Sequence, residues 1–223
     1  MNRRELLTGA ASISSLFLAG CASKTSSRSF EGKKSNSALA SFNYRKIYGR
    51  KPQEQFPLPA INLKRVPKKF WRRQVKFQTE HPVGTVIVNT KTFYLHLVQK
   101  NGKAMRYGVG LGRQGFEWSG QGRIQWKQKW PKWTPPDEMV ARQPELKKWS
   151  IANGGMPPGL DNPLGARALY IFQNGEDTLY RIHGSPEYWT IGKAVSSGCV
   201  RMLNQDVVDL YSRVSSGSRL VVI

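Results

Sequence analysis

Cysteine and histidine are scarce in this 223-residue chain, which has two cysteines and three histidines. The histidines are His81, His96 and His183, and none of them lies beside another histidine or a cysteine at the spacing of zinc ligands. The sequence therefore predicts no metal site. The composition allows one disulfide, between Cys21 and Cys199, so the state of Cys21 decides whether Cys199 is a free thiol.

Acidic residues are also few, with 14 Asp and Glu against 35 Lys and Arg and a formal net charge of +21. Residues 22–82 hold 15 basic and 3 acidic residues, so much of the excess lies there. A chain this basic could bind nucleic acid, or an anionic envelope polymer or membrane surface. A solvated basic linker with no specific partner is a further interpretation. Because the N-terminus indicates export, we expect an envelope partner and no nucleic acid.

Long hydrophobic runs are absent from the N-terminus, where one would mark a transmembrane helix. Residues 6–20 are fewer and less apolar than the roughly 20 residues that such a helix needs. Arg3 and Arg4 precede them, and this order is typical of an export signal. The paired arginines also indicate twin-arginine export, but only weakly. The stretch ends in "LAGC" (Leu18–Cys21), which resembles the bacterial lipobox. We therefore predict a signal over residues 1–20, the alternatives being an ordinary signal peptide or an uncleaved anchor.

The lipobox resemblance implies that Cys21 carries lipid and anchors the exported protein at the periplasmic face of a membrane. Ala22 and Ser23 follow it, with no Asp, and by resemblance to lipoproteins with that sorting rule the outer membrane is favoured over the inner. A lipidated Cys21 cannot pair with Cys199. Cys199 would then be a single thiol in an oxidising compartment, where a leftover cysteine is a candidate reactive group.

Composition divides the rest of the chain into three parts. Residues 21–55 begin Ser-rich and polar, and we interpret them as a flexible tether. Residues 56–82 form a basic arm in which "KKFWRRQVKF" alternates basic and bulky side chains, as a strand or a short arm against the domain would. Residues 83–223 are numerous enough to bury a core, and we predict one catalytic domain there.

The pattern of this domain predicts a mainly β fold with one or few helices. Short β-branched and aromatic runs are separated by hairpin turns at residues 89–91, 101–102 and 174–175. A helix capped by Asn204 and a last strand at Leu220–Ile223 are expected near the C-terminus. Residues 125–167 form a long irregular stretch with four tryptophans. We interpret it as a folded lid or cleft wall, and a hydrophobic cluster without a ligand is the alternative.

His183 and Cys199 are the candidate catalytic pair. His183 ends a predicted strand at "YRIHG", where Gly184 would let the chain turn sharply. Cys199 lies sixteen residues further on. An imidazole can take the proton of a thiol and form an ion pair, which activates the sulfur. The alternatives are a small core cysteine and a hydrogen-bonded histidine at a strand end.

The neighbours of the cysteine suit acyl transfer. The N–H groups of Gly198 and Cys199 could point at a developing oxyanion. Arg201 could hold a carboxylate or support that negative charge. Ser196 and Ser197 are further candidates for substrate binding because they directly precede the glycine and the thiol.

The segments "IHG" (Ile182–Gly184) and "SSGCVRMLNQDVVDLY" (Ser196–Tyr211) resemble the signature of the L,D-transpeptidase family, with its YkuD-type catalytic domain. "NPLGARAL" and the final "RLVVI" are also similar, and the resemblance spans about residues 83–223. It implies a β-sandwich-like domain with few helices. It also implies an enzyme that needs no metal or other cofactor and is inhibited by carbapenems.

The same resemblance assigns roles to the site residues. Cys199 would attack the peptide bond after meso-diaminopimelate in a peptidoglycan stem tetrapeptide, release D-alanine and form a thioester. His183 would act as general base and then as acid, oriented by the carbonyl of Gly184. The acceptor amine would come from a second diaminopimelate, giving a 3→3 crosslink, or from a lysine of an envelope protein.

Two segments depart from the family pattern. Ser197 stands where the family most often has histidine, so a binding role for that residue is in question. "EWSGQGRIQW" (Glu117–Trp126) only loosely matches the usual T-P-x-G stretch, which bears on the donor cleft. Two other functions stay open: a hydrolase on the same scaffold, with water as acceptor, and a non-catalytic wall-binding lipoprotein that uses its basic arm.

Overall fold

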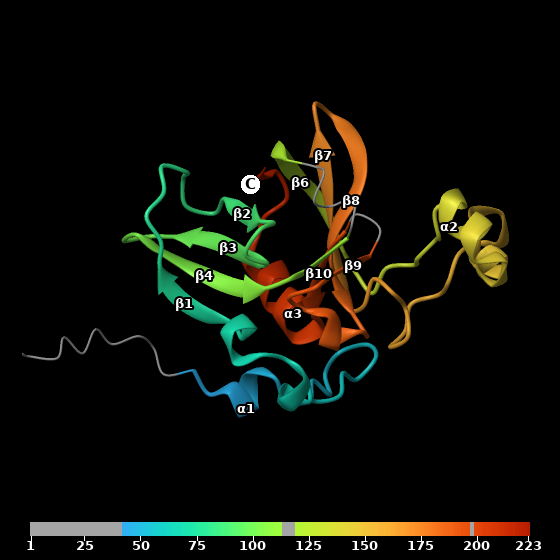
Figure 1. Ribbon diagram of the computed structural model, residues 1–223, viewed down its shortest axis with the longest axis horizontal. Helices are drawn as coiled ribbons and strands as arrows, with labels where there is room; N and C mark the ends of the chain where they lie inside the picture. The colour runs from blue at the N-terminus through green and yellow to red at the C-terminus, as the bar shows by residue number, and fades with distance from the viewer. Residues whose placement is uncertain (1–41, 113–118, 197–198) are drawn as a thin grey trace, which may run out of the picture. The chain divides into compact units, whose positions relative to one another are not determined.

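The computed structural model describes residues 42–112, 119–196 and 199–223. In this part of the chain, eleven strands form one sheet with the order β1-β4-β3-β2-β11-β6-β7-β8-β10-β5-β9 (Figure 1). The strands are β1 Arg73–Lys76, β2 Val86–Asn89, β3 Tyr94–Gln99, β4 Lys103–Gly108, β5 Gly110–Gly112, β6 Gly120–Lys129, β7 Arg167–Gln173, β8 Glu176–Ser185, β9 Ala194–Ser196, β10 Val200–Leu203 and β11 Ser218–Val222. The prediction of a mainly β fold with few helices is confirmed.

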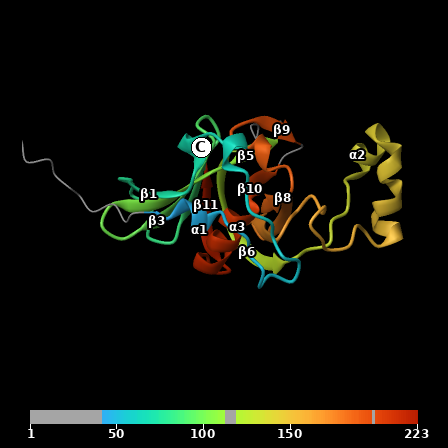
Figure 2. The same cartoon turned by 90° about the horizontal axis from the view of Figure 1, so that it is seen from below.

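Helices are short in the described residues, and one of them completes the core. They are α1 Tyr44–Ile47, α2 Asp137–Arg142 and α3 Asn204–Arg213, with 3-10 turns η1 Leu63–Arg65, η2 Lys68–Phe70, η4 Pro144–Trp149, η5 Ile151–Asn153 and η6 Tyr188–Thr190. Helix α3 packs against β7, β8 and β10 (Figure 2). Its Val207 and Leu210 are fully buried among the core-facing side chains of the sheet. No helix in the described residues is long and apolar enough to cross a membrane.

The predicted hairpins are present, although the turn expected at residues 89–91 lies at 90–93 because β2 includes Asn89. Asn101 and Gly102 join β3 to β4, both with φ of 60°. Asn174 and Gly175 join β7 to β8 with φ of 52° and 87°. Positive φ at both central residues gives the twist that a two-residue hairpin needs, and Asn and Gly tolerate that conformation best. The β7–β8 hairpin bears on the candidate site because β8 carries His183.

The predicted cap of α3 is wrong. Leu203 is the N-cap residue, and Asn204 is the first residue of the helix. The Asn204 side chain instead accepts a hydrogen bond of 2.9 Å from the backbone N–H of Ala166. It is 8% exposed, and it ties the helix to the start of β7. Tertiary contact has therefore taken over a side chain whose sequence position suits local capping.

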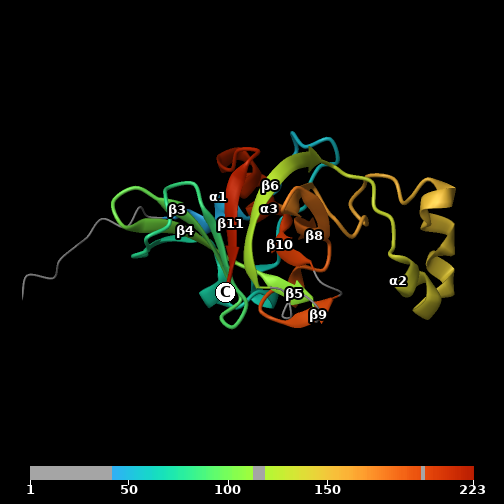
Figure 3. The same cartoon turned by 90° about the horizontal axis from the view of Figure 1, so that it is seen from above.

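The long irregular stretch is shorter than predicted, since β6 continues to Lys129. The segment between β6 and β7 contains α2, η4 and η5, and a bridge between Trp133 and Met156 joins its two ends. Figure 3 shows how the chain leaves the end of β6 to reach α2. Of the four tryptophans, Trp130 is buried at 4% exposure and Trp126 stays exposed at 42% on the sheet.

Residues 42–72 pack on the catalytic domain. Tyr48 is 2% exposed and shares a cluster with Phe70 of η2 and with Leu203. Strand β1 then pairs with β4 in antiparallel register, so the basic arm of residues 56–82 contributes an edge strand. Of the tether predicted for residues 21–55, only 42–55 is described, and there the chain is bound to the domain because its aromatic residues bury apolar surface.

Candidate active site

Two neighbouring parallel strands, β8 and β10, hold the predicted pair. Their register places Arg201 beside His183 and Val200 beside Ile182. Cys199 directly precedes β10, two residues before Arg201, so it lies on the same face as His183. The strand spacing and rise put the two Cα atoms about 8 Å apart, within reach of the two side chains.

His183 is buried, with 5% of its surface exposed. Its Nδ1 atom lies 2.5 Å from the carbonyl oxygen of Gly184, so Nδ1 carries the proton and donates it to this acceptor. The contact expected from the family resemblance is thus present, and it leaves Nε2 as the basic nitrogen. Burial lowers the pKa of His183 to about 4, while hydrogen bonding to the carbonyls of Gly184 and Pro163 acts in the opposite direction.

Cys199 is a free, partly exposed cysteine whose carbonyl accepts a hydrogen bond of 3.2 Å from the N–H of Gly112 in β5. Burial of the sulfur raises the pKa of Cys199, although the N–H of Arg181 and the charges of Arg181 and Arg201 act to lower it. Both shifts favour the uncharged forms at rest, so the ion pair between Cys199 and His183 stays a prediction that burial opposes. The arrangement suits a thiol that gives up its proton to His183 as it attacks.

Gly184 has a different structural role from the one predicted. It lies inside β8, with a backbone conformation open to any residue, and not at a sharp turn. A Cβ atom at this position would collide with Oδ1 of Asn204 and press on Val207. The close approach of α3 to β8 therefore requires glycine, and the same approach fixes the carbonyl that holds His183.

The structure describes only some of the other predicted site residues. Arg201 donates a hydrogen bond of 2.7 Å to the carboxylate of Glu187, so its guanidinium already has an anionic partner. Ser196 ends β9 beside Gly112 of β5. Ser197, Gly198 and Cys21 lie outside the described residues.

A ladder of side chains beside the cysteine was missed by sequence reasoning. Arg181 lies opposite Tyr170 in the β7–β8 pair, with its guanidinium carbon 4.3 Å from the centre of the tyrosine ring. Trp126 stacks on the tyrosine from β6 at a ring distance of 3.6 Å. Asp177 accepts two hydrogen bonds from Arg181, of 2.6 and 2.8 Å. Only strand register brings these separated residues together, so spacing in the sequence could not reveal them.

A buried asparagine organises the loop that precedes β7. The Asn162 side chain is 0% exposed and donates to the carbonyl oxygens of Pro131 and Pro157 at 3.1 and 3.0 Å. It also accepts from the N–H of Leu164 at 2.9 Å. This network fixes the segment that brings the Pro163 carbonyl to the imidazole of His183. The segment is part of "NPLGARAL", which the family resemblance had already singled out.

No group of three or more His, Cys, Asp or Glu side chains within the described ranges is arranged as a metal site. The chemistry that the described part of the site offers is that of a thiol, an imidazole and backbone dipoles.

Comparison with known proteins adds the family. The L,D-transpeptidase catalytic domain (YkuD) matches residues 84–223. The chain is 31% identical over 143 residues to the probable L,D-transpeptidase ErfK/SrfK of Escherichia coli strain K12, a match that covers 62% of this chain and 43% of that protein. It is 41% identical over 83 residues to the putative L,D-transpeptidase YqjB of Bacillus subtilis, covering 37% and 45%.

A solved structure from Brucella melitensis is also similar. It is described as a probable carnitine operon oxidoreductase, has 42% sequence identity and a TM-score of 0.50, and is matched over 73% of this chain and 99% of that one. The matched region spans less than half the length of the two transpeptidase relatives. The family match covers well over half of this chain, and the mainly β fold of the chain agrees with that family. The chain therefore belongs to the L,D-transpeptidase family with a YkuD-type catalytic domain.

Proposed function

We propose that the protein is a peptidoglycan L,D-transpeptidase with Cys199 as its nucleophile. The sulfur attacks the carbonyl carbon of the third stem residue, meso-diaminopimelate, as the thiol proton moves to Nε2 of His183. The bond to D-alanine then breaks, the proton passes to the departing amine, and a thioester remains on Cys199. The acceptor amine next attacks the thioester and loses a proton to His183, which passes it to the departing sulfur, so that the thiol and the neutral imidazole are restored.

One observation carries this proposal: His183 and Cys199 lie on one face of adjacent parallel strands, with Nδ1 of the imidazole held by Gly184. A carbonyl takes the place that a carboxylate has in a Ser-His-Asp triad. Because a carbonyl carries no full charge, it orients the ring without strongly favouring the imidazolium. This agrees with a pair that is uncharged at rest and becomes polar only during attack.

The proposal is tested by incubating the protein with disaccharide-tetrapeptide and following the muropeptides by mass spectrometry. We expect D-alanine release, a crosslinked dimer, and a covalent carbapenem adduct on Cys199. The Cys199→Ala variant should show none of these, while Lys100→Gln, on the exposed turn between β3 and β4, should form the same adduct. Absence of both D-alanine release and the adduct in the wild type would defeat the proposal.

The same assay separates the two other functions. A hydrolase shares the thioester step, so it would give tripeptide without dimer. A non-catalytic wall-binding protein would sediment with peptidoglycan as well in the Cys199→Ala form as in the wild type, with no turnover in either. Transfer to an envelope protein would appear as a protein carrying a muropeptide on a lysine.

For location, we propose export and lipid attachment at Cys21, with the outer membrane as the destination. The support is the sequence alone: the two arginines, the short apolar stretch and "LAGC". Cells expressing wild type and Cys21→Ser would be fractionated and the protein followed by immunoblot. The wild type should be found with outer membranes and gain the mass of a lipid. An unchanged distribution of the variant would overturn the lipid anchor.

A further inference from the structure

The face of the sheet that carries Cys199 continues far beyond the catalytic pair. Successive side chains of a strand point to opposite faces of the sheet, so the residues of five adjoining strands that point into the core mark the face opposite to the one that carries Cys199. These residues are Ile124, Leu169, Ile182, Met202 and Leu220. Side chains one position away on each strand, among them His183 and Arg219, therefore point away from the core, on the face that also carries the cysteine.

The ladder of Arg181, Tyr170 and Trp126 forms the first part of this face. Arg181 stands beside the thiol, Tyr170 beside Arg181, and Trp126 beside Tyr170, each on the next strand. Asp177 accepts two hydrogen bonds from Arg181 and neutralises its charge. The guanidinium of Arg181 is therefore held in place and is not available as a cation for a ligand. Trp126 remains 42% exposed although it is stacked, so its outer surface is open to a ligand.

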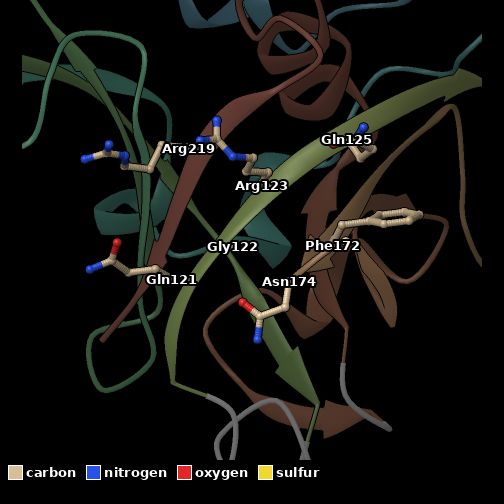
Figure 4. A pocket seen from close by; sticks show the side chains of 8 residues that line it. Gln121, Gly122, Arg123, Gln125, Phe172, Asn174 and Arg219 are labelled. Atoms are coloured by element: carbon tan, nitrogen blue, oxygen red, sulfur yellow. The ribbon is translucent and has the colours of Figure 1, made fainter.

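A pocket of about 440 Å³ lies further along the same strands (Figure 4). Its lining is polar and basic, with one aromatic ring: Gln121, Gly122, Arg123, Gln125, Phe172, Asn174, Gly175 and Arg219. Figure 4 shows Arg123 and Arg219 on the neighbouring strands β6 and β11, with Phe172 and Asn174 on the other side of β6. The two arginines are paired directly in the register of these strands.

Both guanidinium groups are available. Arg123 donates from Nη1 to the carbonyl oxygen of Gly217 at 3.1 Å, which holds its position but does not neutralise it. Within the described residues, no ion pair involves Arg123 or Arg219, whereas Arg167, Arg181, Arg201 and Arg213 each have a carboxylate partner. The two adjacent cations repel one another, and although water screens this repulsion at exposed side chains, an anion bound between them would relieve it.

We propose that the pocket with Arg123 and Arg219, here called the arginine pocket, is a remote substrate subsite that binds a carboxylate-bearing segment of the peptidoglycan strand whose stem peptide reacts at Cys199. The inference rests on the proposed function, because it takes the wall polymer as substrate. Arginine suits this ligand since its planar fork matches a carboxylate. The exposed ring of Trp126, which lies on β6 between Cys199 and the arginine pocket, offers an apolar surface for the chain that joins the two sites.

The distance supports a segment beyond the reacting peptide. Three strand spacings separate Cys199 from β6, about 14 Å. Arg123 pairs with Phe172 and Trp126 with Tyr170 across a bulge in β6, so Arg123 and Trp126 are two residues apart in the register of β7, about 7 Å. The straight path is therefore about 16 Å. A fully extended tetrapeptide spans at most about 14 Å. A free stem peptide held at the thiol would not reach the arginine pocket, whereas one still attached to its polymer would.

A binding experiment tests this with turnover removed. The full-length protein carrying Cys199→Ala is sedimented with purified peptidoglycan sacculi, alone and with Arg123→Gln and Arg219→Gln added. Because exposed ion pairs are individually weak, we expect the double change to raise the apparent Kd about fivefold to tenfold. Lys91→Gln with Lys100→Gln removes the same charge from exposed turns and should change the Kd less than twofold. The protein with both arginines should have the same raised Kd for sacculi whose carboxylates are amidated as the double variant has for native sacculi.

A kinetic arm uses protein with Cys199 intact. The double variant should raise KM for glycan-linked substrate with kcat unchanged, and leave KM for free tetrapeptide unchanged. Equal sacculus binding by the double variant and the parent, or equal losses in the lysine control, would overturn the subsite. Absence of D-alanine release together with pocket-dependent binding would defeat the proposed function and leave the subsite standing. Thermal unfolding of each variant excludes misfolding as the cause of a loss.

Discussion

The imidazole of His183 and the carbonyl of Gly184 are held 2.5 Å apart by the packing of α3 on β8. Gly184 can sit there only because it has no side chain to collide with Asn204. Two adjacent residues of the "IHG" segment thus serve one purpose: the histidine provides the base, and the glycine provides both the space and the acceptor that orients it. The behaviour of this site, and of the segments that hold it, can be tested in four ways.

The first prediction concerns the thiol. Burial raises the pKa of Cys199 and lowers that of His183 to about 4, so both shifts favour the uncharged forms near neutral pH. With Cys21→Ser as background, the rate of alkylation by iodoacetamide should rise with an apparent pKa above about 8.5. His183→Gln should leave this profile nearly unchanged while abolishing D-alanine release. Fast alkylation at pH 6 that disappears in His183→Gln would instead show that the two groups form a thiolate–imidazolium ion pair at rest.

The second prediction concerns space at Gly184. Gly184→Ala adds a methyl group against Asn204, so we expect the free energy of unfolding to fall by about 2 kcal/mol, with lower kcat in the folded fraction. Gly159→Ala is the matched control, because nothing lies within 4 Å of its added Cβ. Urea unfolding measures both. A Gly184→Ala protein as stable and active as Gly159→Ala would contradict the packing argument.

The third prediction concerns Asp206, a fully buried carboxyl in α3. Tyr48 donates to it at 3.2 Å, Arg72 lies 3.7 Å away, and Asp209 shares that arginine at 2.9 Å. Burial raises the pKa of Asp206 to about 7, against about 3.9 in an unfolded chain. Between these values the folded state binds more protons, so this group stabilises the fold increasingly as pH falls from 7 towards 4.

The check is to measure the free energy of unfolding from pH 8 to pH 5 in the wild type and in Asp206→Asn. Other titrating groups, including His183, are common to both proteins, so the difference isolates Asp206. The wild type should gain stability relative to the variant as the pH falls. A difference that stays constant, or that grows in the other direction, would show that Asp206 is ionised in the fold.

The fourth prediction concerns the segment before β1. Glu54 accepts hydrogen bonds of 2.7 and 2.8 Å from Arg167 at the start of β7, and one of 3.1 Å from the indole of Trp130. Glu54→Gln leaves the guanidinium, 7% exposed, without its anion, so we expect a loss of about 3 kcal/mol in the free energy of unfolding. Glu176→Gln, at the exposed start of β8, should cost less than about 0.5 kcal/mol. Equal stability of the two variants would show that the segment is not bound in solution as in the structure.

Local chemistry made part of the fold predictable. The Asn-Gly pairs at 101–102 and 174–175 form two hairpins because only residues that tolerate positive φ fit those turns. The apolar spacing of Val207 and Leu210 indicated the one amphipathic helix in the described residues that packs on the sheet. The cap of that helix could not be predicted, since Asn204 bonds to Ala166, 38 residues away in the sequence.

The sequence by itself determined the identity of the chemistry: one thiol, one histidine in "IHG", and the spacing that resembles a family. Only the tertiary structure decided how these groups are charged, because burial and backbone carbonyls set the pKa values of Cys199 and His183. It also decided what surrounds them. The register of five strands aligns Arg181, Trp126 and Arg123 on one face, and register depends on pairing between distant segments, which no local pattern encodes.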